Sequence, residues 1–408
     1  MKNKIIASLL ALALLPALVI SVTADEPEYS DSVDWNKFRG ENITINVYNW
    51  GEYISVDDGG EDAFDTNKEF EKLTGIKVNY TNFASNEELY AKLKNGGSSY
   101  DIIIPSDYMI ARMINEDMLE KLDFSNIPNY DALIMDKFKG MDYDPTEEYS
   151  VPYTWGMVGI IYNTTLVDEE DDIESWQILW NEKYANNILM FSNSRDAFAI
   201  ACKYLGYSMN TTDEQELRNA ANALVDQKLL VQAYVMDEIF DKMTGGEAAL
   251  APYYAGDAIT MINDNPDLAY AVPREGTNLF VDAMCIPKGA KNKEAAELYI
   301  NFMCETKAAL ANIEYIGYST PQREVPEYLD PELAENPISY PDDEVLANTE
   351  AFIALPSATT RLMDELWTSI LTANETAPWT IPVFLIACLG ASITINVVRS
   401  RKKKQNNG

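Results

Sequence analysis

The sequence predicts an α/β protein built on a mostly parallel sheet, and two observations carry that prediction. From Ile43 onward, strands with alternating apolar residues are followed by amphipathic helices, in the order strand, helix, strand, helix, strand. A further set of strands and helices begins near Ser175 and continues along the chain. At 408 residues the chain is long enough for two domains, each with its own hydrophobic core.

The first set of elements forms a βαβαβ unit, which is typical of a doubly wound sheet. Its predicted members are strand 43–47, helix 61–73, strand 76–80, helix 86–94 and strand 102–104. Ser106 is the expected N-cap of the next helix. Ligands of such sheets bind beyond the carboxyl ends of the strands, and the first strand leads there into Trp50, Glu52 and Tyr53.

The second set is predicted with less regular spacing. Two neighbouring extended segments, 149–155 and 158–162, come before it. Its members are helix 175–183, strand 188–191, helices 195–205 and 213–228, strands 248–254, 268–272 and 280–287, and helices 293–304, 307–316 and 357–371. Cys202, Cys285 and Cys304 fall inside these elements without metal-type spacing, so we expect free core thiols.

The sequence predicts segments for export and membrane anchoring at the two ends of the chain. Residues 1–24 combine Lys2 and Lys4 with an apolar run and small residues, which predicts a secretory signal peptide. Residues 25–41 are acidic and aperiodic, which predicts a flexible leader. Residues 378–398 carry no charge and would span ~31 Å as a helix at ~1.5 Å per residue, which predicts a transmembrane anchor. The basic tail 399–408 places the C-terminus in the cytoplasm and the rest outside the membrane.

The charge balance excludes several classes of function. The formal net charge is −34, and the segment between the two apolar ends carries −41, with 24 basic against 65 acidic residues. Such a surface repels nucleic acid and can steer cations toward a cleft, although solubility alone also accounts for it. The chain contains no histidine, which removes Ser-His-Asp and Cys-His catalysis and histidine-based metal sites.

The loop after the first strand has the chemistry of a cation site. Trp50 and Tyr53 offer ring faces that attract positive charge, and Glu52 offers a carboxylate that neutralises it. Taken alone, the cluster fits core packing equally well.

Seven motifs in order resemble the spermidine/putrescine-binding proteins of bacterial polyamine ABC importers, over about residues 42–373. The motifs are Tyr48-Asn49-Trp50-Gly51-Glu52-Tyr53, Tyr100-Asp101-Ile102-Ile103-Ile104-Pro105-Ser106-Asp107-Tyr108, Val151-Pro152-Tyr153-Thr154-Trp155-Gly156, Ser194-Arg195-Asp196-Ala197-Phe198, Leu205-Gly206-Tyr207-Ser208, Phe280-Val281-Asp282 and Ile316-Gly317-Tyr318-Ser319-Thr320-Pro321. The resemblance implies a periplasmic-binding-protein-like fold of type II, with two lobes joined by crossing strands. It divides the chain into lobe 1 (42–151 plus 281–326) and lobe 2 (152–280 plus 327–373).

The resemblance also implies which residues contact a polyamine. The carried-over positions are Trp50, Glu52, Tyr53, Ser106, Tyr108, Asn193, Asp196, Tyr254, Phe280, Asp282 and Tyr318, with Asp107 as an additional acid. Asn193 stands where spermidine-type proteins have an aspartate, and Asp107 can offset that loss. Tyr254 and Phe280 replace tryptophans, Gly51 replaces a threonine, and Phe352 stands near a usual glutamine. These departures bear on the preferred polyamine length.

The implied function is a membrane-tethered receptor that passes putrescine or spermidine to an ABC permease, with no cofactor, no metal and no enzymatic activity. Three alternatives stay open at this point. Tyr253 and Tyr254 could hold ferric iron together with carboxylates, in the same fold. Glu52 and Asp282 could serve as the carboxylate pair of an extracellular enzyme. The chain could also be a surface sensor or adhesin that binds a ligand without handing it to a permease.

Overall fold

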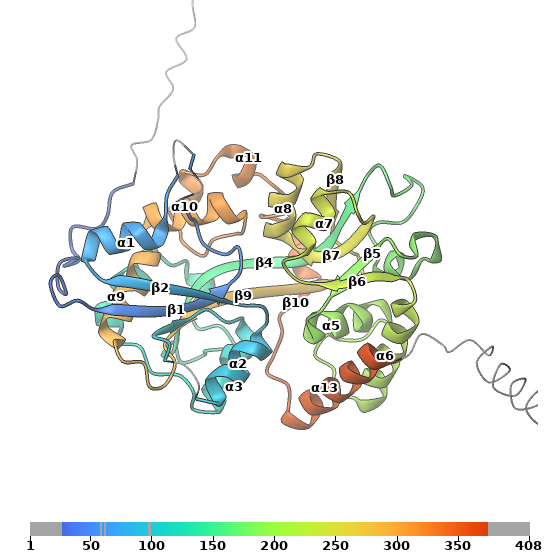
Figure 1. Ribbon diagram of the computed structural model, residues 1–408, viewed down its shortest axis with the longest axis horizontal. Helices are drawn as coiled ribbons and strands as arrows, with labels where there is room; N and C mark the ends of the chain where they lie inside the picture. The colour runs from blue at the N-terminus through green and yellow to red at the C-terminus, as the bar shows by residue number, and fades with distance from the viewer. Residues whose placement is uncertain (1–26, 58, 61–62, 97–98, 374–408) are drawn as a thin grey trace, which may run out of the picture.

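A computed structural model describes residues 27–57, 59–60, 63–96 and 99–373 (Figure 1). The strands are β1 (Thr44–Trp50), β2 (Lys77–Phe83), β3 (Ile102–Ile103), β4 (Ser150–Asn163), β5 (Ile188–Phe191), β6 (Val231–Val235), β7 (Leu250–Tyr254), β8 (Leu268–Ala271), β9 (Thr277–Cys285) and β10 (Thr349–Glu350). They form one sheet in the order β2-β1-β3-β9-β4-β7-β5-β6, with β10 paired to β9 and β8 paired to β4. The pairs β1–β2, β1–β3, β5–β6 and β5–β7 are parallel, whereas β4 and β9 run antiparallel to their neighbours in that order.

Helices cover both faces of this sheet. The α-helices are α1 (Thr66–Thr74), α2 (Asn86–Lys94), α3 (Asp107–Asn115), α4 (Pro128–Leu133), α5 (Ser194–Tyr204), α6 (Glu214–Lys228), α7 (Ile239–Thr244), α8 (Ala255–Asp264), α9 (Lys293–Met303), α10 (Thr306–Ile316), α11 (Pro331–Ala334), α12 (Asp343–Ala347) and α13 (Ser357–Thr372). The 3₁₀ turns are η1 (Phe124–Asn126), η2 (Asp136–Phe138), η3 (Trp176–Trp180), η4 (Glu182–Tyr184) and η5 (Val325–Glu327). In the left half of Figure 1, α1 and α10 lie on one side of the sheet and α2 and α3 on the other. In the right half, α7 and α8 lie opposite α5, α6 and α13.

Two hydrophobic cores lie in these two halves. The first contains Phe70 and Phe302, and the second contains Trp176 and Phe191. The two long strands β4 and β9 run from one half to the other (Figure 1). Along β4 the core changes within a few residues, because Trp155 packs in the first cluster and Val158 in the second.

The predicted α/β fold with strands that cross between two units is therefore confirmed, with corrections to several of its elements. The two extended segments 149–155 and 158–162 are one 14-residue strand, β4. Gly156 lies between the two expected segments, but the strand continues through it. Nearly every residue of β4 is buried, as in a strand that is covered on both faces. The helix expected at 175–183 is two 3₁₀ turns, η3 and η4, and strand β6 follows α6 where none was expected.

The C-terminal segment does not keep to one core. We expected residues 327–373 to belong to lobe 2 throughout. However, Leu329 and Phe352 pack in the first cluster, and Met363 and Ile370 pack in the second. The segment therefore runs along the first unit before α13 packs against α6 in the second.

The acidic leader is not an unpacked segment over its described part, residues 27–41. Trp35 is buried and meets Phe302 edge-on at 6.2 Å between ring centroids. Its indole Nε1 donates to the carbonyl of Ser30, whose own N–H donates to Glu305. The burial of Trp35 thus packs this segment against the first core, although its acidic sequence predicted a flexible leader.

The expected signal peptide (1–24), transmembrane anchor (378–398) and basic tail (399–408) lie outside the described residues. Between residues 27 and 373 we find no helix with the length and apolar character needed to cross a bilayer. The expected free thiols Cys202, Cys285 and Cys304 are confirmed as buried and unbridged.

Candidate functional site

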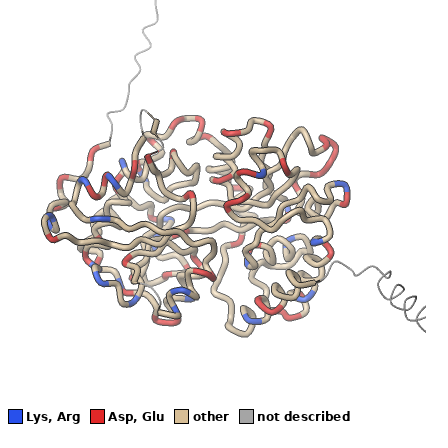
Figure 2. Tube along the Cα trace, viewed as in Figure 1, with Lys and Arg blue, Asp and Glu red and all other residues tan. Residues whose placement is uncertain are grey.

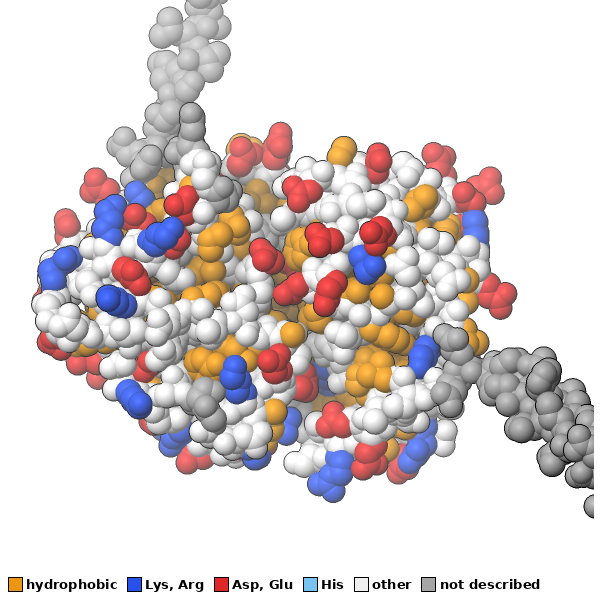
Figure 3. Space-filling model, in the orientation of Figure 1, with side chains coloured by type: hydrophobic (Ala, Val, Ile, Leu, Met, Phe, Trp, Pro, Cys, Tyr) orange, Lys and Arg blue, Asp and Glu red, His pale blue; other side chains and the backbone are white. Residues whose placement is uncertain are grey.

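A pocket opens where the two units meet, at the ends of β1, β3 and β7 and along β9. It encloses about 570 Å³ of empty space, its open mouth included. Ten of the twelve residues expected from sequence line it, namely Trp50, Tyr53, Ser106, Tyr108, Asn193, Asp196, Tyr254, Phe280, Asp282 and Tyr318. Eight further residues complete the lining: Gly51, Asn86, Met236, Asp237, Tyr253, Asp257, Asn278 and Phe352. Figure 3 shows acidic side chains near the junction of the two halves, and Figure 2 shows how charge is distributed along the chain.

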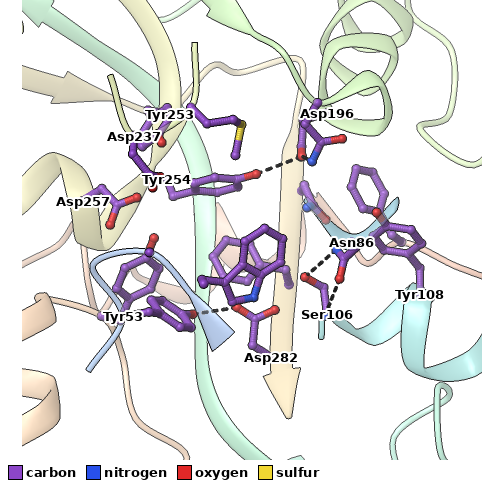
Figure 4. A pocket seen from close by; sticks show the side chains of 18 residues that line it. Tyr53, Asn86, Ser106, Tyr108, Asp196, Asp237, Tyr253, Tyr254, Asp257 and Asp282 are labelled. Atoms are coloured by element: carbon purple, nitrogen blue, oxygen red, sulfur yellow. Dashed lines mark hydrogen bonds between the residues drawn. The ribbon is translucent and has the colours of Figure 1, made fainter. Parts of the chain in front are cut away.

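Asp282 supplies a carboxylate to this pocket from strand β9. Residues 278, 280 and 282 all face the pocket because side chains alternate along strand β9. Asp282 is only 4 % exposed, and the Tyr53 hydroxyl donates to its Oδ2 at 2.7 Å (Figure 4). Its Oδ1 is buried without a hydrogen-bond partner among the described residues. Burial raises the pKa of Asp282 to about 6, although the hydrogen bond from Tyr53 and the nearby Ser106 hydroxyl oppose the rise.

Asp196 supplies a second carboxylate, on the first turn of α5. Asn193 caps this helix by accepting from the N–H of Arg195, and its Nδ2 donates to Asp196 Oδ2 at 2.6 Å. The Tyr254 hydroxyl donates to the same oxygen at 3.0 Å (Figure 4). Burial raises the pKa of Asp196 to about 7. None of the ion pairs among the described residues involves Asp196 or Asp282.

A third acidic position is formed by Asp237 and Asp257, which sequence reasoning missed. Asp257 lies in the first turn of α8, directly after β7, and burial raises its pKa well above the usual range. Gly51 lies against Asp237, and a Cβ at this position would clash with the Asp237 carboxylate. The absence of a side chain at Gly51 therefore lets an acid from the second unit approach the end of β1. A strand end followed by an acid was the available signal for Asp257.

Two of the expected site residues do not line the pocket. Glu52 is exposed in a left-handed backbone conformation (φ 46°), which turns the chain away after Gly51. Asp107 is buried behind the wall, where its Oδ1 accepts from the N–H of Tyr108 at 2.6 Å and its Oδ2 from the N–H of Val281 at 3.3 Å. Burial raises the pKa of Asp107 to about 8. The neighbouring Ser106 does line the pocket and exchanges two hydrogen bonds of 3.1 Å with Asn86 (Figure 4).

Aromatic rings form most of the remaining wall. Tyr318 meets Tyr53 edge-on at 4.9 Å between centroids, and Phe280 meets Tyr254 edge-on at 5.5 Å. Trp50 packs on Phe83 at 4.5 Å. Rings held by one another present rigid faces at low entropic cost, and those faces attract cations as well as methylene groups. The pocket thus suits an elongated organic cation.

The pair Tyr253 and Tyr254 does not form a common metal site. Tyr254 donates its hydroxyl to Asp196, whereas the buried ring of Tyr253 stacks on Phe191 at 5.3 Å. Across the described ranges, no group of three or more Cys, Asp or Glu residues is placed to hold a metal ion. The ferric-ion alternative gains no support from this arrangement.

Two α/β units, crossing strands and a lined pocket at their junction define the class of two-lobed solute receptors. Residues 66–341 match the family described as bacterial extracellular solute-binding protein, and the chain belongs to that family. The family binds and transports solutes, which confirms the prediction of a receptor rather than an enzyme.

Relatives and solved structures give the same result. The spermidine/putrescine-binding periplasmic protein of Escherichia coli K12 is 35% identical over 311 residues, or 76% of this chain and 86% of that protein. The putrescine-binding periplasmic protein SpuD of Pseudomonas aeruginosa is 29% identical over 346 residues, covering 81% and 92%. A structure described as a spermidine/putrescine ABC transporter from Listeria monocytogenes superposes with a TM-score of 0.77 at 36% identity, covering 82% of this chain and 100% of that one.

Proposed function

We propose that this chain is an extracellular receptor that binds putrescine or spermidine between its two units and delivers it to an ABC importer. The observation that carries the proposal is the carboxylate of Asp282, buried in an aromatic pocket with one oxygen unpartnered. A buried charge is costly unless it is paired, and a protonated amine is the partner that an aromatic pocket admits.

The three acidic positions explain how a linear polyamine would lie. Asp282 would receive the ammonium nearest the middle of the pocket, Asp196 the one at one end, and Asp237 with Asp257 the one at the other end. The rings of Trp50 and Tyr254 would pack on the methylene groups between them. Three acidic positions favour spermidine, which has three amines, over putrescine, which has two.

The proposal keeps the other expected site residues, in different roles. Ser106, Tyr108, Asn193, Phe280 and Tyr318 would shape the wall. Glu52 would contribute negative potential from outside the lining, and Tyr53 would orient Asp282 by its hydrogen bond. Asp107 would hold the backbone N–H groups of Tyr108 and Val281 behind the wall. The lining residues are supported by their convergence in one pocket and by the chemistry of that pocket.

We also propose that the receptor is held at the membrane. Support comes from the sequence of residues 1–24, 378–398 and 399–408, which read as a signal peptide, an anchor and a basic cytoplasmic tail. Lobe 1 would comprise 42–151, 281–326 and most of 327–352, and lobe 2 would comprise 152–280 with α13. The two hydrophobic clusters support this division, although Tyr153, Trp155 and Phe280, close to its boundaries, pack in the first cluster.

Calorimetric titration of the full chain in detergent tests the proposal. Spermidine and putrescine should bind with saturable heats, whereas arginine should not, because its carboxylate would enter an acidic pocket. The absence of binding by any polyamine, including spermine, would overturn the proposed ligand class and leave the family assignment intact.

A further inference from the structure

One arginine lies immediately behind the wall of this cation pocket, which is an unexpected place for a positive charge. Arg195 is on the first turn of α5 and is only 4 % exposed. The carbon at the centre of its guanidinium group lies 4.4 Å from the centroid of the Phe352 ring and 5.6 Å from that of Tyr108. Both rings line the pocket, so the guanidinium group supports two parts of the wall from behind.

The contacts of Arg195 connect the two units. Its helix packs in the second core through Phe198 and Ile200, whereas Tyr108 and Phe352 pack in the first core. Tyr108 in turn donates its hydroxyl to Glu87 Oε1 on α2 at 3.0 Å. The side chain of Arg195 therefore reaches from one unit onto the aromatic residues of the other.

Few polar partners compensate the burial of this guanidinium group. Its Nη2 donates to Asn210 Oδ1 at 2.8 Å and to the carbonyl of Ile353 at 3.4 Å. Its Nε and Nη1 are buried and have no hydrogen-bond partner among the described residues. Arg195 also lines a second cavity of about 410 Å³, together with the carboxyl groups of Glu87 and Asp364. If the units separated, water would reach these nitrogen atoms and the ring contacts would be lost.

We propose that Arg195 is a positioning residue for the ligand, which holds the rings of Tyr108 and Phe352 against a bound polyamine and keeps the two units together while it is bound. The proposal rests on the proposed function and adds a residue that does not line the pocket. Since the guanidinium group acts on the closed arrangement, its loss should speed release of the ligand more than it slows capture.

The test compares three variants of the full chain in detergent: Arg195→Gln, Arg195→Lys and the matched control Arg112→Gln. Arg112 also lies over a ring, at 3.7 Å from the centroid of Tyr90, but both residues belong to helices of the first unit, α3 and α2. Stopped-flow fluorescence, with Trp50 in the pocket as a reporter, gives the association and dissociation rate constants for spermidine. Thermal unfolding gives the stability of each variant without ligand.

We expect Arg195→Gln to raise the dissociation rate constant for spermidine about tenfold, because the loss of a desolvated cation–π contact has about that effect. The association rate constant should change little. Arg195→Lys keeps a cation over the rings and should recover part of that loss. Arg112→Gln should change neither rate constant.

An unchanged dissociation rate constant in folded Arg195→Gln, or the same acceleration in Arg112→Gln, would overturn the positioning role. If Arg195→Gln fails to fold, Arg195→Lys decides: a wild-type dissociation rate constant overturns the role, and an intermediate acceleration supports it. Absence of spermidine binding to the wild-type chain would overturn the proposed function itself and this inference with it, whereas normal binding with unaffected variants would overturn this inference alone.

Discussion

Replacing Asp282 by Asn isolates the charge that this residue supplies to the pocket, because the amide has nearly the same shape and can still accept the Tyr53 hydroxyl. Asp282 is 4 % exposed, and its Oδ1 has no partner within the described part of the chain. If a ligand ammonium is that partner, the substitution removes a buried, hydrogen-bonded charge pair. Losses of that kind amount to about 2–5 kcal/mol, or roughly 30-fold to 5,000-fold in Kd.

The same substitution should stabilise the unliganded protein. Burial raises the pKa of Asp282 from 3.8 to about 6, so the folded state binds this proton more tightly than the unfolded state does. Stability contributed by such a group is present below pH 3.8 and is lost as the pH rises toward 6. At pH 7 the ionised carboxylate therefore costs about 3 kcal/mol, and Asp282→Asn removes that cost.

Titration calorimetry and thermal unfolding, both at pH 7, check the two halves of this prediction on one protein. Asp107→Asn is the matched control, since Asp107 is equally buried but directs its carboxylate to the N–H groups of Tyr108 and Val281. We expect that control to alter polyamine affinity far less. Lower stability of unliganded Asp282→Asn together with unchanged affinity would refute the reasoning, because it would mark Asp282 as a structural residue.

Three further predictions concern the pocket and the ends of the chain. Trp50→Ala should weaken spermidine binding by ~0.5–2 kcal/mol from cation–π contact and by more through lost apolar burial, and unchanged affinity in calorimetry would make Trp50 a packing residue. Spermidine affinity should fall as the pH is lowered from about 8 to about 5. Asp196 and Asp282, with pKa values of about 7 and 6, take up protons over this range, and the protons compete with the ligand. An affinity that does not change with pH would contradict this prediction. Removing residues 375–408 should release a secreted, spermidine-binding protein, and failure of that protein to fold would show that the segment belongs to the core.

Much of the fold could be predicted because its strands and helices have regular periods. The alternation at 43–47 predicts β1, and the helix predicted at 86–94 is α2. The crossing strand β4 was divided in two because its residues are buried on both faces, so that no alternation marks its continuity. The packing of Trp35 could not be predicted for a different reason. The acidic sequence around it indicates a flexible segment and does not reveal that this one aromatic side chain packs on Phe302.

The site could be predicted where single motifs contribute side chains at strand ends. Ser106, Asp196 and Asp282 belong to motifs with a family resemblance, and all three line the pocket. Asp237 could not be found in this way, because its place in the pocket depends on the missing side chain of Gly51 in a distant part of the chain. Likewise the positive φ that turns Glu52 away is a property of the folded loop.

The pKa values of the buried acids explain how so acidic a pocket can exist before a ligand arrives. Burial raises the pKa of Asp196 to about 7 and that of Asp282 to about 6, so at neutral pH these carboxyl groups are protonated for part of the time. The empty pocket therefore carries less negative charge than its carboxyl groups could supply. A polyamine that enters stabilises the ionised forms, lowers their pKa values and displaces protons. Ligand and protons thus compete for the same oxygen atoms, which makes the charge of the pocket depend on its occupant.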